Sequence, residues 1–534
     1  MSESELKMPE LGDLVTGEQH NELQRSISWT GAFWVASGVP ALVLFSIGGI
    51  AATLGAASWF VWTLSIIMGF MQSFTYAEIA GLFPNKSGGA SVYGAIAWVR
   101  YSKLVAPLST WCNWFAWSPV LAIGTGLSAG YILTALFPDT SLVKTWQITL
   151  FNLGFIKEGL AIRINSTFIL GAVILLAIFI AQHYGIAKAA KIQMMMAIAA
   201  LLPLIIIGIV PLITGDVIRA NFSPFVPLSG AWDKGGWTLF LGGMFIAAWS
   251  TYGFETAVCY TREFKNPKTD TFKAIFYSGL LCMFVFITVP LAFQGVLGVK
   301  GMTDPGILDG SGVAAAMAGM IHGGAFVTNL IVLMLIFALL LAIMTSMAGS
   351  ARTLYQASVD GWLPKYLSHV NKHGAPTKAM WTDLGFNLIL LLMSDYLFVL
   401  AASNVGYIIF NFLNLNSGWI HRVDNAHVER PFKAPSWLLG ANTVLAFVNL
   451  VFLGAGANVW GKGTLLTGLL WAAMIIPVFL YRHYVTDKGV FPPQMLEELQ
   501  LEDGKTLEKR AGFWPYAAVI GGAIVVIVSN RIFS

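Results

Sequence analysis

The chain has 534 residues, of which 56% are hydrophobic and 11% are charged, with a mean hydropathy of +0.71. A water-soluble fold of this length cannot bury so much apolar surface, and apolar runs of about 18 residues or more recur throughout the chain. The runs are continuous rather than alternating, which excludes a β-barrel. The net charge is +4, and the basic clusters lie at the ends of the apolar runs, where they indicate membrane topology, so no nucleic-acid partner is expected.

A polar tail comes first, at residues 1–28, without the short apolar core and cleavage site of a signal peptide. The apolar runs that follow predict thirteen membrane-spanning helices. They lie near residues 29–54, 57–83, 104–136, 165–185, 189–214, 238–262, 272–297, 325–350, 377–395, 397–420, 437–458, 463–484 and 512–530. The run 104–136 exceeds what one crossing needs, which predicts a single tilted helix.

The positions of the cations predict how the chain is oriented. With the N-terminus in the cytoplasm, most of the 31 lysine and arginine residues fall on the cytoplasmic side. The sequence therefore predicts a multi-pass protein of the cytoplasmic (inner) membrane, surrounded by lipid. The thirteenth span, within 512–534, would place the C-terminus outside.

Helix breakers occur in the middle of the first span and of the sixth. The first contains Ser37-Gly-Val-Pro40, where proline removes a backbone hydrogen bond. The sixth contains Gly253, followed by Glu255. If 29–214 and 238–420 are two five-helix repeats, these breaks hold matching positions, which predicts a binding site between half-helices. The alternative is that both are kinks of the kind that membrane helices tolerate.

The remaining segments are expected to connect or flank the two repeats. Spans eleven and twelve occupy 437–484, and 485–511 is typical of an amphipathic cytoplasmic helix. The external loop 298–324 is either a small lid or a plain connector.

Several stretches resemble the amino acid–polyamine–organocation (APC) transporter superfamily. They are Tyr76-Ala-Glu-Ile-Ala80, Phe83-Pro-Asn-Lys-Ser-Gly-Gly-Ala-Ser-Val-Tyr93, Trp249-Ser-Thr-Tyr-Gly-Phe-Glu255, Glu263-Phe-Lys-Asn-Pro267, Ser350-Ala-Arg-Thr-Leu-Tyr355, Asp360-Gly-Trp-Leu-Pro364, Gly374-Ala-Pro376 and Arg430-Pro-Phe-Lys-Ala-Pro435. Their order and spacing hold over residues 30–440. The resemblance implies an all-α, LeuT-type fold with a 5+5 inverted repeat, about 12–13 transmembrane helices, and discontinuous spans 1 and 6. It also implies transport of amino acids, polyamines or related amines.

This chain departs from the superfamily pattern in span one, at the turn that binds the substrate carboxylate. Many members of the superfamily hold it with a Gly-Ser-Gly turn in span one, whereas this chain has Ser37-Gly38 followed by apolar residues at 41–45. An α-amino acid and a decarboxylated amine both remain open as substrates.

Nine residues at the two breaks are expected to bind the substrate. They are Ser37, Gly38, Val39, Pro40, Trp249, Ser250, Tyr252, Gly253 and Phe254. Of these, Trp249 and Tyr252 are the aromatic residues expected to close over an amine. The alternative for any single ring is a lipid-facing or core position.

Four residues are expected in coupling or gating. Glu255 lies at a depth of about 10 Å from the cytoplasmic cluster that starts at Arg262. Burial would favour its neutral form and a nearby cation would favour its charged form, as a proton-coupling or gating residue requires. The alternative is that it caps the broken helix. Glu263 either forms a gate ion pair near Arg262 and Lys265 or follows ordinary helix-end electrostatics.

The other two are Thr345 and Ser346 in span eight, where sodium-coupled relatives use hydroxyls with span-one carbonyls. Hydroxyls in membrane helices mostly bond back to their own helix, so Na⁺ is the less favoured coupling ion. Proton-coupled relatives can use a lysine midway along span five, and residues 194–200 contain none. Coupling, to H⁺ or otherwise, stays open.

The sequence does not indicate an enzyme. The eight histidines lack metal-ligand spacing, the glycine pairs match no phosphate loop, and neither a metal nor an organic cofactor is expected. We therefore expect a secondary active transporter, a symporter or an exchanger, of amino acids or related amines. The alternatives are a polyamine or organic-cation carrier and a non-transporting amino-acid sensor on a transporter scaffold. Substrate identity, direction and oligomeric state are not determined.

Overall fold

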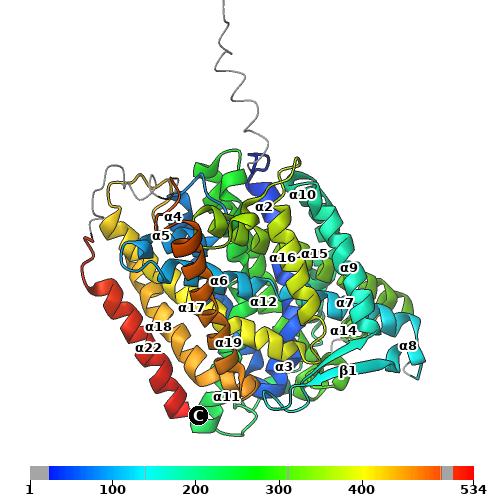
Figure 1. The fold of residues 1–534 in the computed structure, drawn as a ribbon. Coiled ribbons are helices and arrows are strands. Elements are labelled where there is room, and N and C mark those ends of the chain that lie inside the picture. The colour runs from blue at the N-terminus through cyan, green and yellow to red at the C-terminus, as the bar shows by residue number, and fades with distance from the viewer. Residues whose placement is uncertain (1–22, 139, 309–311, 494, 496–508, 534) are drawn as a thin grey trace, which may run out of the picture.

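The structure is a computed structural model, and it describes residues 23–138, 140–308, 312–493, 495 and 509–533 (Figure 1). Among them, ten helical stretches are long and apolar enough to cross a membrane. The first of these, 29–81, contains three successive α-helices, which make up the first two predicted spans. Helices satisfy their own backbone hydrogen bonds, which is what a lipid environment requires of a spanning segment.

The predicted spans are filled in chain order by interrupted and continuous helices. They are α2 (Trp29–Ala36) with α3 (Val43–Leu54), α4 (Ser58–Gly81), α6 (Val105–Trp117) with α7 (Val120–Leu136), α9 (Ser166–His183), α10 (Ile186–Thr214), α11 (Lys234–Thr251), α12 (Pro267–Met302), α15 (Ala325–Val359), α16 (Thr377–Leu390), α17 (Tyr396–Asp424), α18 (Ser436–Gly456), α19 (Thr464–Ala473) with α20 (Ile475–Leu480), and α22 (Trp514–Phe533). Shorter helices connect them: α5 (Ala90–Val99), α8 (Leu142–Thr145), α13 (Pro305–Leu308) and α14 (Val313–Met320).

Both predicted breaks are present. Helix α2 ends at Ala36, and a 3₁₀ turn, η2 (Val39–Leu42), precedes α3. Helix α11 ends at Thr251, and the chain continues as an eleven-residue 3₁₀ helix, η5 (Gly253–Glu263). A 3₁₀ run of this length is uncommon and often marks a hinge. The prediction that spans one and six are discontinuous is confirmed.

The third apolar run forms one helical stretch, Val105–Leu136, as predicted. It is interrupted at Ser118 and Pro119, which separate α6 from α7. Proline cannot donate the hydrogen bond that would continue α6. The prediction of one span is therefore confirmed, and the interruption at this proline is a feature that hydropathy did not predict.

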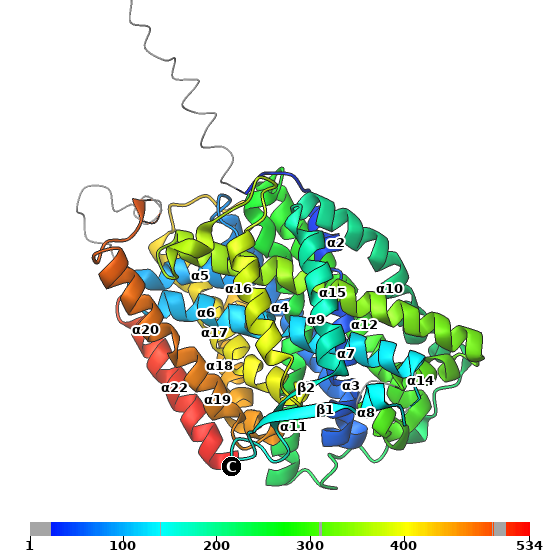
Figure 2. The ribbon, with the colours of Figure 1, turned by 45° about the vertical axis from the view of Figure 1, so that its right-hand side comes forward.

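A β-hairpin follows α8, in a region where the sequence predicted no strand. Strands β1 (Gln147–Asn152) and β2 (Ala161–Asn165) pair antiparallel. The hairpin also binds the loop between α16 and α17: the N–H of Arg163 donates to the carbonyl of Leu392, and the N–H of Ser394 donates to the carbonyl of Ala161. In Figure 2 the hairpin lies beside α8 at one end of the helix bundle.

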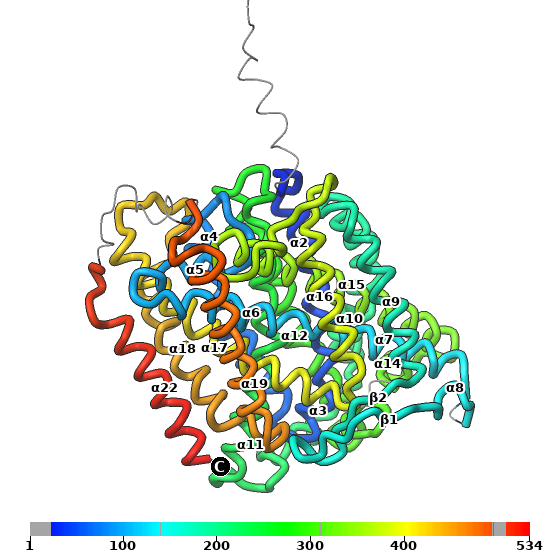
Figure 3. The backbone as a smooth tube through the Cα atoms, viewed as in Figure 1, coloured from blue at the N-terminus to red at the C-terminus, as the bar shows by residue number. Residues whose placement is uncertain are grey.

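The bundle has two ends, which we name by their contents. At the N-side, residues 26 and 27 hydrogen-bond with Glu263 and Lys265 where η5 ends. The hairpin side carries β1, β2 and the C-terminal end of α22 (Figure 1). The backbone trace shows α22 at the edge of the bundle against α18 (Figure 3). Beyond the short π-helix η8 (Tyr481–Thr486), residues 487–493 are mostly turn and extended chain. Most of the helix expected within 485–511 lies outside the described residues.

Candidate functional site

The two breaks lie against each other. A Cβ at Gly253 would come within 3.1 Å of the Val39 side chain and 2.5 Å of the Trp117 ring. The Ser250 hydroxyl donates to the Leu42 carbonyl across the same contact, at 3.4 Å. Glycine at 253 therefore allows the backbone of η5 to approach η2 and α6 more closely than any other residue would.

The first break also lies directly on α15. A Cβ at Gly38 would meet the Thr345 hydroxyl at 2.5 Å and the Leu341 carbonyl at 2.6 Å. The Thr345 hydroxyl donates to the carbonyl of Val35 at 2.5 Å. Predicted site residues of spans one, six and eight are thus brought together, and Pro40 is buried in the η2 turn between α2 and α3.

Glu255 is buried beside this contact, with 1% of its surface exposed. The indole N–H of Trp117 donates to its Oε1 at 2.9 Å. Its Oε2 and the side-chain Nδ2 of Asn113 make no hydrogen bond of normal length within the described chain, although Asn113 and the backbone N–H of Ala90 lie beside the carboxylate. Buried polar atoms are nearly always satisfied, so a carboxylate oxygen in this state indicates a proton, water or ligand position.

Aromatic rings surround the breaks on one side. The Trp249 ring lies 6.0 Å from that of Phe45 and 6.1 Å from that of Trp117, centroid to centroid. Tyr407 meets Trp117 edge-on at 5.5 Å. The Trp249 indole donates to the carbonyl of Ala116 at 2.9 Å, which fixes the ring. The sequence did not single out Trp117; its one local signal was the helix end marked by Pro119.

Two predicted aromatic residues point elsewhere. The Tyr252 hydroxyl donates to Asn449 of α18 at 3.1 Å. Phe254 lies against α12, where a Cβ at Gly279 would come within 2.9 Å of its ring. In this conformation their side chains pack on surrounding helices, whereas Trp249 faces the other rings of the break.

The remaining predicted hydroxyls bond to backbone carbonyls. Ser37 donates to Trp34 within its own helix, and Ser346 donates to Trp117 of α6, both at 2.5 Å. Such bonds are usual for hydroxyls in membrane helices. Ser346 nevertheless differs, because its acceptor lies on another helix and belongs to the residue that binds Glu255.

Buried ion pairs join distant segments at the N-side. Glu263 accepts from two nitrogens of Arg352, Nε and Nη2, the latter at 2.9 Å, instead of pairing with its sequence neighbours. Lys86 pairs with Asp360, and both side chains are fully buried. Glu78 accepts from both Arg422 and Arg430. Breaking a buried pair by removing one partner is costly, so these contacts fix how the helix ends meet at this face.

These features define a class: a polytopic helical membrane protein in which two interrupted helices meet beside a buried carboxylate. Residues 27–480 match the family model described as amino acid permease. The chain belongs to the amino acid permease family, and the APC resemblance is confirmed.

Three relatives show the range of the family. The branched-chain amino acid permease BcaP of Bacillus subtilis is 26% identical over 66% of this chain and 67% of its own length. BcaP of Lactococcus lactis is 23% identical over 84% of this chain and 93% of its own. The polyamine transporter PUT1 of Oryza sativa is 22% identical over 77% of this chain and 69% of its own.

Proposed function

We propose that this chain is a secondary active transporter that carries an amino acid across the cytoplasmic membrane by alternating access. The observation that carries the proposal is Glu255, a buried carboxylate with one unpartnered oxygen where the two helix breaks meet. An ionisable group inside a membrane bundle marks a substrate or proton pathway. Substrate would bind between η2 and η5, with Trp249 as the aromatic wall.

The breaks supply the groups that a zwitterion needs. Half-helix ends present free N–H groups to a carboxylate and free carbonyls to an ammonium group. Gly38 and Gly253 carry no side chain, but in this conformation both are closely packed, Gly38 by Thr345 and Leu341 and Gly253 by Trp117 and Val39. The backbone groups of 37–40 and 249–254 would therefore reach a substrate only when these contacts separate, and Tyr252 and Phe254 would act only after a change of side-chain position.

Coupling to protons is favoured over coupling to sodium. A proton can satisfy Glu255 directly, whereas sodium would have to share the Thr345 hydroxyl and the Val35 carbonyl. Those two oxygens are already joined by a hydrogen bond of 2.5 Å. Symport and exchange both fit this arrangement.

Opening at the N-side requires the ion pairs there to separate. Arg352 belongs to α15 and Glu263 to the end of η5, so their contact joins the two elements that flank the site. We propose that this face is cytoplasmic and that the Glu263–Arg352 pair closes the inward gate.

An amino acid is favoured over a polyamine as substrate. A polyamine carries two or more positive charges and needs several carboxylates. Of the two acids in η5, Glu255 is unpartnered at one oxygen and Glu263 is occupied by Arg352. The names of the bacterial relatives make L-leucine the first substrate to test.

Transport by the purified protein in proteoliposomes tests the proposal. Labelled L-leucine should accumulate against a gradient or exchange with internal leucine, and putrescine should compete poorly. An imposed proton gradient should drive uptake, whereas a sodium gradient should not. Binding without accumulation or exchange would favour the sensor alternative, and uptake of putrescine in preference to leucine would favour the polyamine carrier.

A further inference from the structure

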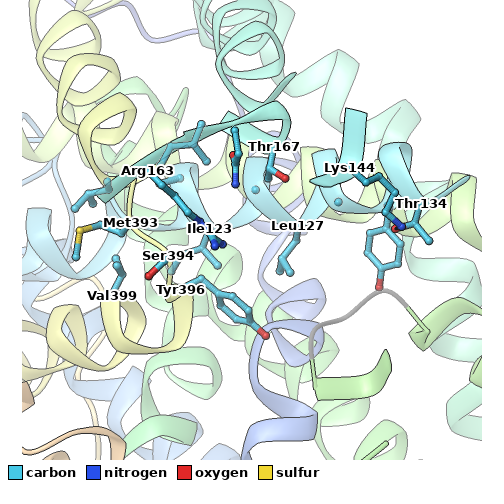
Figure 4. A pocket seen from close by; sticks show the side chains of 17 residues that line it. Ile123, Leu127, Thr134, Lys144, Arg163, Thr167, Met393, Ser394, Tyr396 and Val399 are labelled. Carbon is cyan, nitrogen blue, oxygen red and sulfur yellow. The ribbon is translucent and has the colours of Figure 1, made fainter. Parts of the chain in front are cut away.

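A cavity of about 660 Å³ lies at the hairpin side, away from the helix breaks. It is enclosed by α7, the start of α9, the hairpin and the loop before α17 (Figure 4). Polar and cationic side chains line it from six segments: α7, α8, β2, α9, the loop before α17, and α17 itself. They are Thr134, Lys144, Arg163, Thr167, Ser394 and Tyr396.

Two cationic side chains line the cavity, and both already make hydrogen bonds: Lys144 donates to the Thr134 hydroxyl at 3.3 Å and Arg163 to the Gln147 side chain at 3.2 Å. Lys144 comes from α8 and Arg163 from β2, and Figure 4 shows them on either side of Thr167 at the start of α9. The N-terminus of α9 adds the positive end of a helix dipole to the same space. No aspartate or glutamate is among the described residues that line the cavity.

The floor of the cavity is apolar. Ile123 and Leu127 of α7 lie beneath the cations, and Val399 of α17 lies beside them (Figure 4). The volume is in the range of small-molecule sites. Cations above an apolar floor suit a small carboxylate with an aliphatic chain, and they repel a polyamine.

The cavity and the central site share one helical stretch, α6 followed by α7. Ile123 follows Trp117, the partner of Glu255, by six residues, or about 9 Å of helix rise. One residue further on, a Cβ at Gly124 would lie 3.5 Å from Phe45, which packs on Trp249. The aromatic layer therefore separates the cavity from the breaks.

We propose that this cavity is a capture site, where Lys144 and Arg163 bind the carboxylate of an aliphatic amino acid before it reaches the helix breaks. The proposal rests on the proposed function, because it names a step on the path of that substrate. Charged clefts raise the local concentration of an oppositely charged ligand group, and salt weakens the effect.

The test is the KM for L-leucine uptake by a Lys144→Gln/Arg163→Gln variant in proteoliposomes. At low salt, about 0.01 M, we expect KM to rise about tenfold with little change in maximal rate. Raising salt to about 0.15 M should increase the wild-type KM and leave that of the variant nearly constant. Lys300→Gln, which removes an exposed charge at the end of α12, is the matched control and should behave as wild type.

Two ligands separate carboxylate from amine recognition. 4-Methylpentanoate, which has leucine's carboxylate and side chain without the amine, should inhibit wild-type uptake more than it inhibits the double variant. Isoamylamine, which lacks the carboxylate, should inhibit both equally. The exchange Lys144→Arg/Arg163→Lys keeps both charges and should keep the low KM, which distinguishes charge from a structural role.

Each failure has its own meaning. If the wild-type protein transports leucine and the double variant has the same KM and salt dependence, the capture site is wrong and the transporter stands. If the wild-type protein neither accumulates nor exchanges leucine, the proposed function fails, and the capture site fails with it. If the double variant does not fold, the single Lys144→Gln variant and the charge-retaining exchange decide the question.

Discussion

Two buried carboxylates flank the same helix, and their surroundings differ. Glu255 receives one hydrogen bond of normal length, from Trp117 of α6, and its second oxygen makes none in the described chain, although Asn113 and the N–H of Ala90 lie beside it. Asp383 of α16 receives bonds at both oxygens, from Trp114, Ser118 and Ser350. Both side chains are almost completely buried.

This difference indicates a functional role for Glu255 and a structural role for Asp383. A polar group whose bonds are all made holds helices in one arrangement, and removing it costs stability. Asp383 does this for α6, α15 and α16. A buried polar group with an unmade hydrogen bond indicates a position for a proton, a water molecule or a ligand. Burial alone would have ranked the two acids together; they differ in whether both carboxylate oxygens make hydrogen bonds of normal length.

The largest effect is expected from Glu255→Gln. Glutamine cannot gain or release a proton, so proton-driven leucine uptake should fall by about a hundredfold, which corresponds to about 2.7 kcal/mol. The thermal unfolding temperature should change little, since the amide fills the same space. The uptake rate is measured in proteoliposomes at several pH values, and the unfolding temperature is measured in detergent. Uptake equal to wild type at every pH would remove Glu255 from coupling.

Asp383→Asn should show the opposite pattern. The amide presents N–H groups to hydroxyl or indole donors, and stability should fall by about 1–3 kcal/mol. Uptake per folded molecule should stay within about threefold of wild type, because the cross-link does not touch the substrate path. Thermal unfolding and uptake normalised to folded protein test this. Loss of uptake with unchanged unfolding would make Asp383 a second functional acid.

Two indole donors provide a matched pair. Trp117→Phe removes the donor to Glu255 and keeps most of the ring, so uptake should fall by about tenfold, the value of one charge-assisted bond. Trp114→Phe removes a donor to Asp383 instead, and should lower stability by about 1 kcal/mol with uptake unchanged. Equal effects of the two substitutions on uptake would contradict the comparison.

The smallest effect is expected from Ser350→Ala. It removes one of three donors to Asp383 and should lower the free energy of unfolding by about 1 kcal/mol. The control is Ser350→Thr, which keeps the hydroxyl and should recover most of that loss. A fall in uptake without any fall in unfolding temperature would count against a purely structural role for this hydroxyl.

Local chemistry explains what the sequence could predict. Pro40 and Gly253 disturb a helix wherever they stand, so the two breaks could be located from the chain alone. Glu255 stood out because a charge in an apolar run is rare.

The features that the sequence could not predict depend on contacts between residues far apart in the chain. Trp117 is one of 19 tryptophans, and only folding brings its indole to Glu255. Glu263 has cations next to it in sequence, yet its partner Arg352 comes from α15. The hairpin escaped prediction because β1 is fully exposed and shows no alternation of burial. Asp383 lies in a predicted span, but the donors that satisfy it come from other helices.

The eleven residues of η5 have a mechanical consequence. A 3₁₀ helix rises about 2.0 Å per residue and an α-helix about 1.5 Å, so rewinding this segment as an α-helix would shorten it by about 5.5 Å. Glu255 lies near one end of it and Glu263 at the other. The difference in length between the two forms of this segment therefore equals about one turn of α-helix.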